Sequence, residues 1–163
     1  PPEDYVPPII KEKNIFEVNI NRDNDLLVEG ERMDIKDLRE AAISFIDNGG
    51  GDGKIDEGVP TGPCNYCKGE KSISSSDHPN KAIISVQSDR GTEYGTYLKV
   101  QNELIRAYSV LRNRLSKERY GIAFPELEES YKEDRSNVSL KEKVEDIKRC
   151  YPEIISDAEP TSN

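Results

Sequence analysis

The sequence has few apolar residues, no tryptophan and a single histidine. Only 34% of its 163 residues are hydrophobic, and an equal share is charged. A chain of this length forms one domain, and this composition predicts a small core surrounded by long polar segments. No stretch approaches the roughly 20 consecutive apolar residues of a membrane-spanning helix.

Cations are scarce relative to anions. The chain has 23 Lys and Arg residues but 32 Asp and Glu residues, so its formal net charge is −9 and its pI is about 4.8. Phosphate backbones and anionic lipid surfaces are bound by basic surfaces, which this composition does not provide. We therefore expect no nucleic acid among the partners.

Catalytic motifs are missing as well. His78 is the only histidine and precedes Pro79 in an expected loop, where nothing else supports a Ser-His-Asp triad. The sequence contains no G-x-S-x-G, P-loop or H-E-x-x-H pattern. Acidic residues of the C-terminal third alternate with Lys and Arg, which is typical of solvated helix faces. We expect no enzymatic activity and no required cofactor.

Apolar patterns identify the regular segments of the N-terminal part. Residues 15–20 alternate between apolar and polar, which predicts a half-buried strand, and a second strand that begins with the apolar residues 26–28 completes a hairpin over residues 15–29. Asp34 can cap a helix whose apolar residues follow at helical spacing up to Ile46. Residues 81–89 carry a nearly continuous apolar run, which is typical of a central strand.

The C-terminal part is predominantly helical. Residues 94–119 carry one apolar stripe and predict a helix about 39 Å long, which would extend beyond a small sheet. Two short polar helices follow, and Ser139 is the expected cap of the second. Residues 152–160 can form a last edge strand between two prolines. The order β-β-α-β-α-α-α-β predicts an α+β fold with a mixed four- to five-stranded sheet and helices mostly on one face.

Residues 47–80 hold clusters of Gly, Pro and Ser and include half of a calcium-binding loop. With Gly53 at position 6 of such a loop, position 3 has no side-chain ligand and position 12 is Val59 instead of Glu. For these two reasons an EF-hand is not the interpretation that we favour. A weaker calcium site stays open, and we favour a solvated acidic turn over it. The ligands of the weaker site would be Asp47, Asp52, Asp56 and Glu57.

The three cysteines allow several interpretations. Cys64 and Cys67 form a C-x-x-C pair, but a redox motif would need a helix that starts at the first cysteine, and a proline precedes it here. A zinc site would need further ligands, such as His78 with Cys150 or Asp77. We favour a structural disulfide between Cys64 and Cys67 that closes a tight loop. The role of Cys150 stays open.

Three segments together resemble the periplasmic domain of the ExbD/TolR family. They are "VNINRDNDLLVEGERMDIKDLREAA", "AIISVQSDRGTEYGTYLKVQNELIRAY" and "YPEIISDAEP". The resemblance covers about residues 14–46, 81–115 and 150–160, and the order of elements is the same as in the family. Among its members, the sequence is similar to long ExbD variants of the Bacteroidetes type. No single motif in it is as specific as a set of metal ligands.

The resemblance implies a domain that transmits force. ExbD-like proteins have one transmembrane helix and a periplasmic domain, and they sit as a dimer inside an ExbB pentamer of the inner membrane. This proton-driven motor energises TonB, which opens transporters of the outer membrane. The implied protein is a single-pass inner-membrane protein with this domain in the periplasm and with its transmembrane helix upstream of Pro1. In the TolR branch the domain contacts peptidoglycan, which is the alternative implied here, besides a calcium- or zinc-binding module.

The expected domain organisation follows from the patterns and the resemblance together. Residues 1–13 are Pro-rich and would form a tether after the transmembrane helix. Residues 14–160 would form the ExbD-like domain, with a loop insertion at 47–80 and extra helices at about 125–149. Residues 161–163 would be a tail. The implied partners are an ExbB-like pentamer, a TonB-like protein, a second copy of the chain and, in the alternative, peptidoglycan; their contact residues are unknown.

Overall fold

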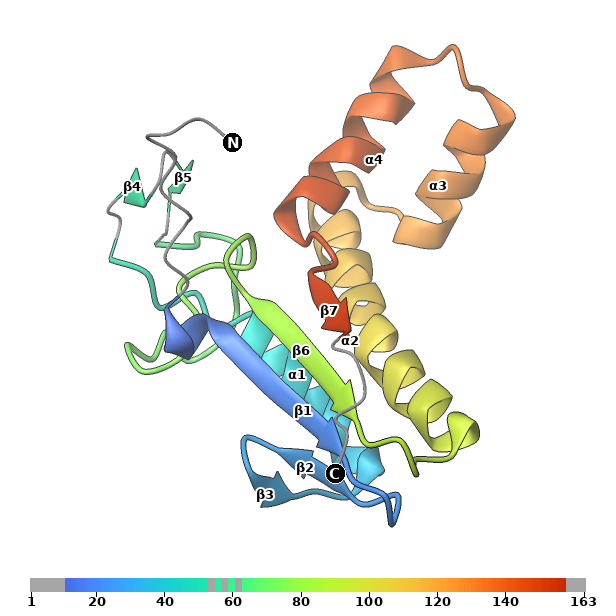
Figure 1. Ribbon diagram of the computed structural model, residues 1–163. Coiled ribbons are helices and arrows are strands. Elements are labelled where there is room, and N and C mark those ends of the chain that lie inside the picture. Colours follow the sequence, from blue (N-terminus) through green and yellow to red (C-terminus); the bar gives the residue numbers. More distant parts are fainter. Residues whose placement is uncertain (1–10, 53–54, 57–58, 61–62, 158–163) are drawn as a thin grey trace, which may run out of the picture.

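The computed structural model describes residues 11–52, 55–56, 59–60 and 63–157. A five-stranded mixed sheet and the helices α1 to α4 dominate this part of the chain, as Figure 1 shows. The expected α+β class and the expected number of strands are confirmed.

The order of strands in the sheet is β3-β2-β1-β6-β7. β6 is parallel to both of its neighbours, whereas β2 is antiparallel to both of its own. The strands are β1 (Ile15–Ile20), β2 (Leu26–Val28), β3 (Glu31–Arg32), β6 (Ile83–Ser88) and β7 (Ile155–Asp157). Parallel neighbours require long crossover connections. The segments between β2 and β6 and between β6 and β7, which contain the helices, provide them.

One face of the sheet is buried. The even-numbered residues of β1 are buried and Glu17 between them is exposed, which confirms the predicted alternation. β6 behaves in the same way, because Ile84 and Val86 are buried while Ile83 is only half-buried. β6 lies between β1 and β7, so it is an interior strand as the apolar run predicted, and the helices cover one face of the sheet.

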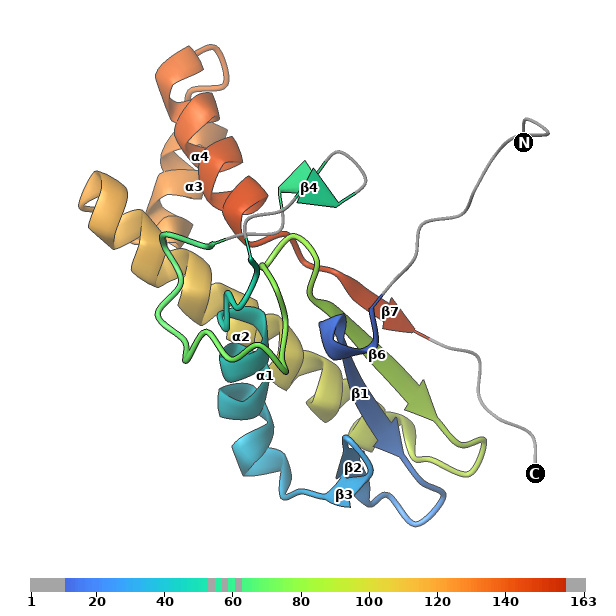
Figure 2. The same ribbon diagram turned by 90° about the vertical axis from the view of Figure 1, so that its left-hand side faces the viewer.

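Two helices lie on the buried face, behind the sheet in Figure 1 and beside it in Figure 2. They are α1 (Leu38–Ile46) and α2 (Tyr94–Tyr120), and α2 ends at Gly121 with a left-handed φ of 70°. The structure thus places α2 within one residue of the predicted range. The apolar side chains that β1, β6, α1 and α2 contribute to the buried core include Val18, Ile20, Leu38, Ala42, Ile46, Ile84, Val86, Val100, Leu104, Ala107, Tyr108, Leu111 and Leu115.

Asp34 caps a different element from the one expected. Its side chain accepts a hydrogen bond from the backbone N–H of Lys36 at 3.1 Å and so caps a 3-10 helix, Ile35–Asp37. The α-helix begins only afterwards, at Leu38. The side-chain chemistry was predicted correctly, but a tighter turn precedes the α-helical segment.

Two further helices form a hairpin on the C-terminal half of α2 (Figure 1). They are α3 (Phe124–Glu133) and α4 (Val138–Cys150), and together they are called the helical arm below. Asn137 is the cap of α4, because its side chain accepts from the N–H of Leu140 at 3.1 Å, so the expectation of Ser139 was wrong. None of the helices in the described ranges is both long enough and apolar enough to span a bilayer.

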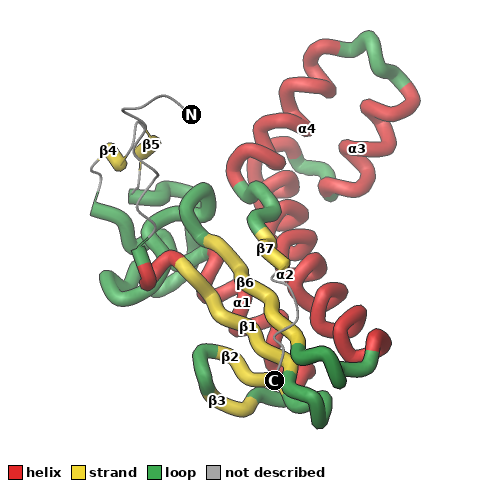
Figure 3. Tube along the Cα trace, viewed as in Figure 1, coloured by secondary structure: helices red, strands yellow, loops and turns green. Residues whose placement is uncertain are grey.

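Residues 47–80, called the insertion below, run mostly as loop between α1 and β6 (Figure 3). They include a short antiparallel pair that the sequence did not predict, β4 (Ile55–Asp56) with β5 (Val59–Pro60). A solvated acidic turn was expected here. That expectation is wrong for Asp47, which is 2% exposed, and several other residues of the insertion are buried as well. These are Asn48, Cys64, Cys67, Ser76 and Asp77.

Candidate functional site

The C-x-x-C pair lies against the end of α1. Cys64 and Cys67 form a disulfide with an S–S distance of 2.10 Å and a Cα–Cα distance of 5.5 Å, and both residues are buried. Gly49 packs on this bond: a Cβ atom at that position would lie 2.9 Å from the Cβ of Cys64, and its φ is +65°. Only glycine combines this backbone conformation with this close approach. The disulfide thus packs against Gly49, three residues after the C-terminal end of α1.

Tyr66, between the two cysteines, reaches across to the helical arm. Its hydroxyl donates to the backbone carbonyl of Cys150 at 2.9 Å. Its ring meets the ring of Tyr151 edge-on, with centroids 5.4 Å apart, and the guanidinium of Arg119 lies over it at 5.4 Å. One side chain of the insertion therefore contacts both α2 and the end of α4.

Asp47 connects the same elements from within. Its carboxylate accepts hydrogen bonds from Arg114 at 3.0 Å, from the hydroxyl of Tyr151 at 2.5 Å and from the backbone N–H of Lys68 at 2.9 Å. Arg114 also donates to the carbonyl of Tyr66 at 3.3 Å. Asp47, Tyr66, Arg114 and Tyr151 are called the Asp47 cluster below. The cluster joins α1, α2, the insertion and the chain after α4 at one point.

The electrostatics of the Asp47 cluster favour a fixed structural joint. Burial raises the pKa of Tyr151, and its hydrogen bond to Asp47 raises it further. Burial also raises the pKa of Tyr66. Burial would lower the pKa of Arg114, but its hydrogen bond to Asp47 outweighs this and raises the pKa overall. The two phenols thus stay neutral and the guanidinium stays charged, which suits a permanent ion pair rather than proton transfer.

The predicted calcium ligands are not brought together in the described part of the chain. The carboxylate of Asp47 is occupied by three donors, as described above. Asp52 is exposed. The side chain of Asp56 and the whole of Glu57 lie outside the described residues. Among the residues that are described, no three His, Cys, Asp or Glu side chains are grouped as metal ligands would be.

The alternative zinc set loses its central pair. Cys64 and Cys67 are bonded to each other, and Cys150 is a buried free thiol at the end of α4. The single histidine, His78, packs edge-on against Tyr66 with ring centroids 5.7 Å apart, and burial lowers its pKa. These contacts explain the burial of His78 without a metal ion.

A second surface lies at the outer edge of the sheet, along β7. The N–H of Ile84 donates to the carbonyl of Ile154 at 2.9 Å, and Ile84 is the register partner of Ile155. In a parallel pair the residues that bond to the neighbour alternate along the strand, so the backbone groups of Ile155 and Asp157 point away from β6. No strand within the described ranges pairs with this edge of β7.

An apolar flank of α2 lies beside the edge of β7. Tyr97 and Gln101 of α2 donate to the carboxylate of Asp157 at 2.9 Å and 2.5 Å, so this side of the helix lies over β7. Glu103, on the other side of α2, bonds to Arg39 of α1 at 2.9 Å. The flank that faces away from α1 carries exposed apolar side chains beyond β7, called the α2 flank below. These are Tyr94, Leu98 and Ile105, which are 72%, 40% and 42% exposed.

Sequence reasoning missed three members of the Asp47 cluster. One signal for Arg114 is present in the sequence, because this arginine lies between Leu111 and Leu115 of the buried stripe of α2 and must find a partner there. Nothing in the local sequence marks Tyr66 or Tyr151. Their roles depend on contacts between segments that are 85 residues apart, which local patterns do not encode.

Neither a protein-family model nor a curated protein matches this sequence.

Proposed function

We propose that this chain is the periplasmic domain of an ExbD-type subunit, which passes the motion of a proton-driven inner-membrane motor to a partner protein. The order of elements and the mixed sheet with helices on one face agree with what the resemblance implies. The observation that carries the proposal is the outer edge of β7, with which no strand of the described residues pairs, beside the α2 flank. Together they form a surface suited to an extended segment of another protein.

Strand addition at β7 explains the exposed side chains of the α2 flank. A new strand would accept and donate hydrogen bonds at the outward backbone groups of Ile155 and Asp157. Every second side chain of that strand would point towards α2 and cover Leu98 and Ile105. Burying these two side chains removes apolar surface from water, whereas unpaired strand edges are ordinarily protected.

The partners follow from this role. A TonB-like protein supplies the extended segment, an ExbB-like pentamer holds the protein through its transmembrane helix, and a second copy completes the dimer. The domain acts by binding and by transmitting load, so it performs no catalysis and needs no cofactor. In the longer protein we expect one apolar span upstream of Pro1, with an acidic residue that handles protons.

Cross-linking at the edge strand tests this function. We would place a photo-reactive amino acid at Ser156, which is exposed, in the full-length membrane protein. Asp157→Pro removes the outward N–H and leaves the hydrogen bonds to β6 in place, since proline is tolerated where the N–H faces away from the sheet. Asp157→Ala is the matched control, because both variants lose the carboxylate that binds Tyr97 and Gln101.

We expect a cross-link to the TonB-like protein in the parent and in Asp157→Ala, and its loss in Asp157→Pro. Far-UV circular dichroism of the two variants should be the same. A cross-link that survives the proline, or no cross-link in the parent protein, would overturn strand pairing at β7. A longer protein without an apolar span would overturn the assignment to a motor.

A further inference from the structure

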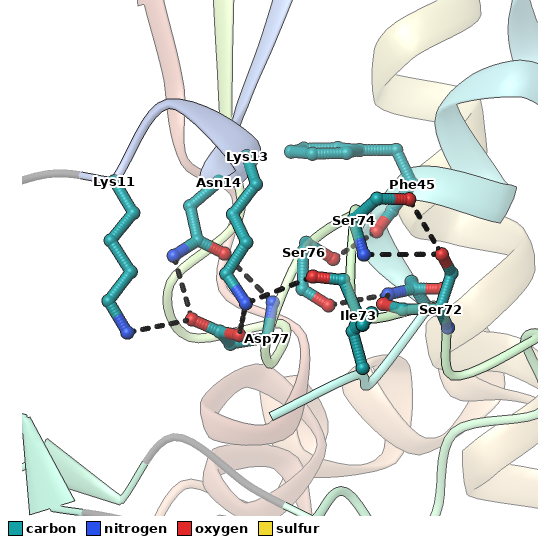
Figure 4. Close-up of polar contacts among 10 residues, drawn as sticks. Lys11, Lys13, Asn14, Phe45, Ser72, Ile73, Ser74, Ser76 and Asp77 are labelled. Atoms are coloured by element: carbon teal, nitrogen blue, oxygen red, sulfur yellow. Dashed lines mark hydrogen bonds and ion pairs between the residues drawn. The ribbon is translucent and has the colours of Figure 1, made fainter. Parts of the chain in front are cut away.

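The chain meets the insertion before it enters the sheet. Residues 11–14, called the lead-in segment below, contain a 3-10 helix, Glu12–Asn14, that leads directly into β1. Figure 4 shows two lysines and an asparagine of this segment converging on Asp77 of the insertion. The ammonium groups of Lys11 and Lys13 lie 3.7 Å and 2.5 Å from its carboxylate.

Asn14 forms a reciprocal pair with Asp77. Its side-chain amide donates to the carboxylate of Asp77 at 3.0 Å, and its side-chain carbonyl accepts from the backbone N–H of Asp77 at 2.8 Å. Both residues are almost fully buried, at 3% and 2% exposure. A buried carboxylate is stable only when hydrogen bonds and cations compensate its charge, and here the lead-in segment supplies them.

The lead-in segment is docked by these polar contacts rather than by a hydrophobic patch. Lys11 and Glu12 are exposed and Lys13 is half-buried, so Asn14 is the only buried residue of the segment. Lys13 adds one more polar contact, to the backbone carbonyl of Ile73 at 3.4 Å. Removal of one charge at Asp77 would therefore remove most of what holds these four residues.

The part of the insertion that contains Asp77 is held at the end of α1, where the hydroxyl of Ser76 donates to the backbone carbonyl of Phe45. The N–H groups of Gly50 and Gly51 donate to the carbonyls of Ser76 and Asp77 at 2.9 Å and 2.8 Å. The side chain of Asn48 donates to the carbonyl of Ser76 at 2.7 Å. Asn48 directly follows Asp47, so the docking point of the lead-in segment and the Asp47 cluster are held by neighbouring residues at the end of α1.

We propose that the insertion is a latch for the lead-in segment: Asp77 holds residues 11–14 against residues 72–77, and release of this contact frees them without unfolding the sheet. While the latch is closed, Lys11 and Lys13 are held against Asp77, so a load applied at Lys11 acts on the insertion. When the latch is open, the same load acts on Ile15 at the start of β1. When extended, the four freed residues add at most about 13 Å of chain ahead of β1, at ~3.3 Å per residue.

This device is independent of the function proposed above. It requires no partner protein, no membrane and no motor, because all of its contacts lie within one chain. A result that removes strand pairing at β7 leaves the latch untouched, and the reverse also holds.

Limited proteolysis tests the latch with the domain as it stands. Trypsin cleaves after lysine, and the peptide bond after Lys13 lies inside the docked segment. When local opening is fast, the cleavage rate follows the population of the open form. Asp77→Ala should accelerate cleavage after Lys13 by about tenfold or more, because it removes the carboxylate that binds Lys11, Lys13 and the side-chain amide of Asn14 and leaves only the backbone N–H at position 77 to bond to Asn14. Mass spectrometry of the released N-terminal peptide gives the rate.

Lys36 is the internal control. This exposed residue lies in the 3-10 helix before α1, far along the chain from Asp77, and cleavage after it reports on the rest of the fold. We expect the rate at Lys36 to stay the same in Asp77→Ala. Asp25→Ala, which breaks the exposed pair with Arg32, is the matched control variant and should change neither rate.

Two results would overturn the latch. Equal acceleration after Lys13 and Lys36 would show that Asp77 stabilises the domain as a whole, and an unchanged rate after Lys13 would show that other contacts dock the segment. If Asp77→Ala does not fold, hydrogen exchange of the milder Asp77→Asn replaces proteolysis. Faster exchange in residues 12–16 with unchanged exchange in β6 supports the latch, and equal change in both contradicts it.

Discussion

Loss of the Asp47 carboxylate should destabilise the domain far more than its position in a Gly-rich loop suggests. Asp47→Ala would leave Arg114, the hydroxyl of Tyr151 and the N–H of Lys68 without their shared acceptor. Breaking a buried ion pair from one side costs about 3–5 kcal/mol. Because the side chain of Arg114 is 29% exposed and water can reach it, we expect the lower end, about 3 kcal/mol.

Urea unfolding measures this loss. The chain contains no tryptophan, so far-UV circular dichroism is the suitable signal. With a slope of about 2 kcal/mol per molar urea, a loss of about 3 kcal/mol lowers the midpoint by about 1.5 M. Tyr151→Phe removes only the hydroxyl and should cost about 1 kcal/mol. Asp25→Ala, which breaks an exposed pair, should lower the midpoint by less than about 0.5 M.

A small effect would refute the structural role of the cluster. If the midpoint of Asp47→Ala falls by no more than that of Asp25→Ala, the carboxylate is hydrated and the insertion does not join α1 to the arm. If Asp47→Ala lowers the urea midpoint strongly and Tyr151→Phe leaves it unchanged, the stabilisation comes from the ion pair between Asp47 and Arg114 alone.

Three further predictions concern the cysteines and the buried aspartate. Alkylation of the denatured, unreduced protein should label only Cys150; three labelled thiols would contradict the disulfide. Replacing Cys64 and Cys67 by serine should cost about 2 kcal/mol in urea unfolding, since the bond closes a very short loop, and an unchanged midpoint would show that the bond adds no stability. Burial raises the pKa of Asp77, but hydrogen bonds to Lys13 and Asn14 outweigh this and lower it overall. The ionised carboxylate of Asp77 therefore stabilises the folded state fully above the ordinary pKa of about 3.9, and this stabilisation is lost as the pH falls through the lower pKa of the folded state. Asp77→Asn should accordingly flatten the acid side of the curve of unfolding free energy against pH.

Much of the fold could be predicted, because periodic segments carry their own signal. The alternation of residues 15–20 and the single stripe of α2 identified a strand and a helix nearly to the residue. The strands β3, β4 and β5 could not be predicted, since two residues are too few to show a period. The apolar run within residues 81–89 identified β6 as an interior strand, and β6 does lie between β1 and β7.

The candidate sites were harder to predict for a physical reason. The pairing of Cys64 and Cys67 was predicted by weighing their spacing against the flanking proline and the lack of further zinc ligands, and the structure confirms it. The insertion has few apolar residues, which suggested a solvated loop, but it is buried through hydrogen bonds. Asn48, for example, bonds through its side chain to the backbone of Ser72 and Ser76, which are 24 and 28 residues away. Polar packing of this kind leaves no hydrophobic pattern in the sequence.

The composition of the membrane complex tests the proposed function most directly. We would purify the full-length protein in detergent together with the ExbB-like protein and determine the mass of the complex by native mass spectrometry. We expect two copies of this protein with five copies of the ExbB-like subunit. A protein that purifies alone, or that forms no complex with a pentameric membrane subunit, would contradict the assignment to a motor.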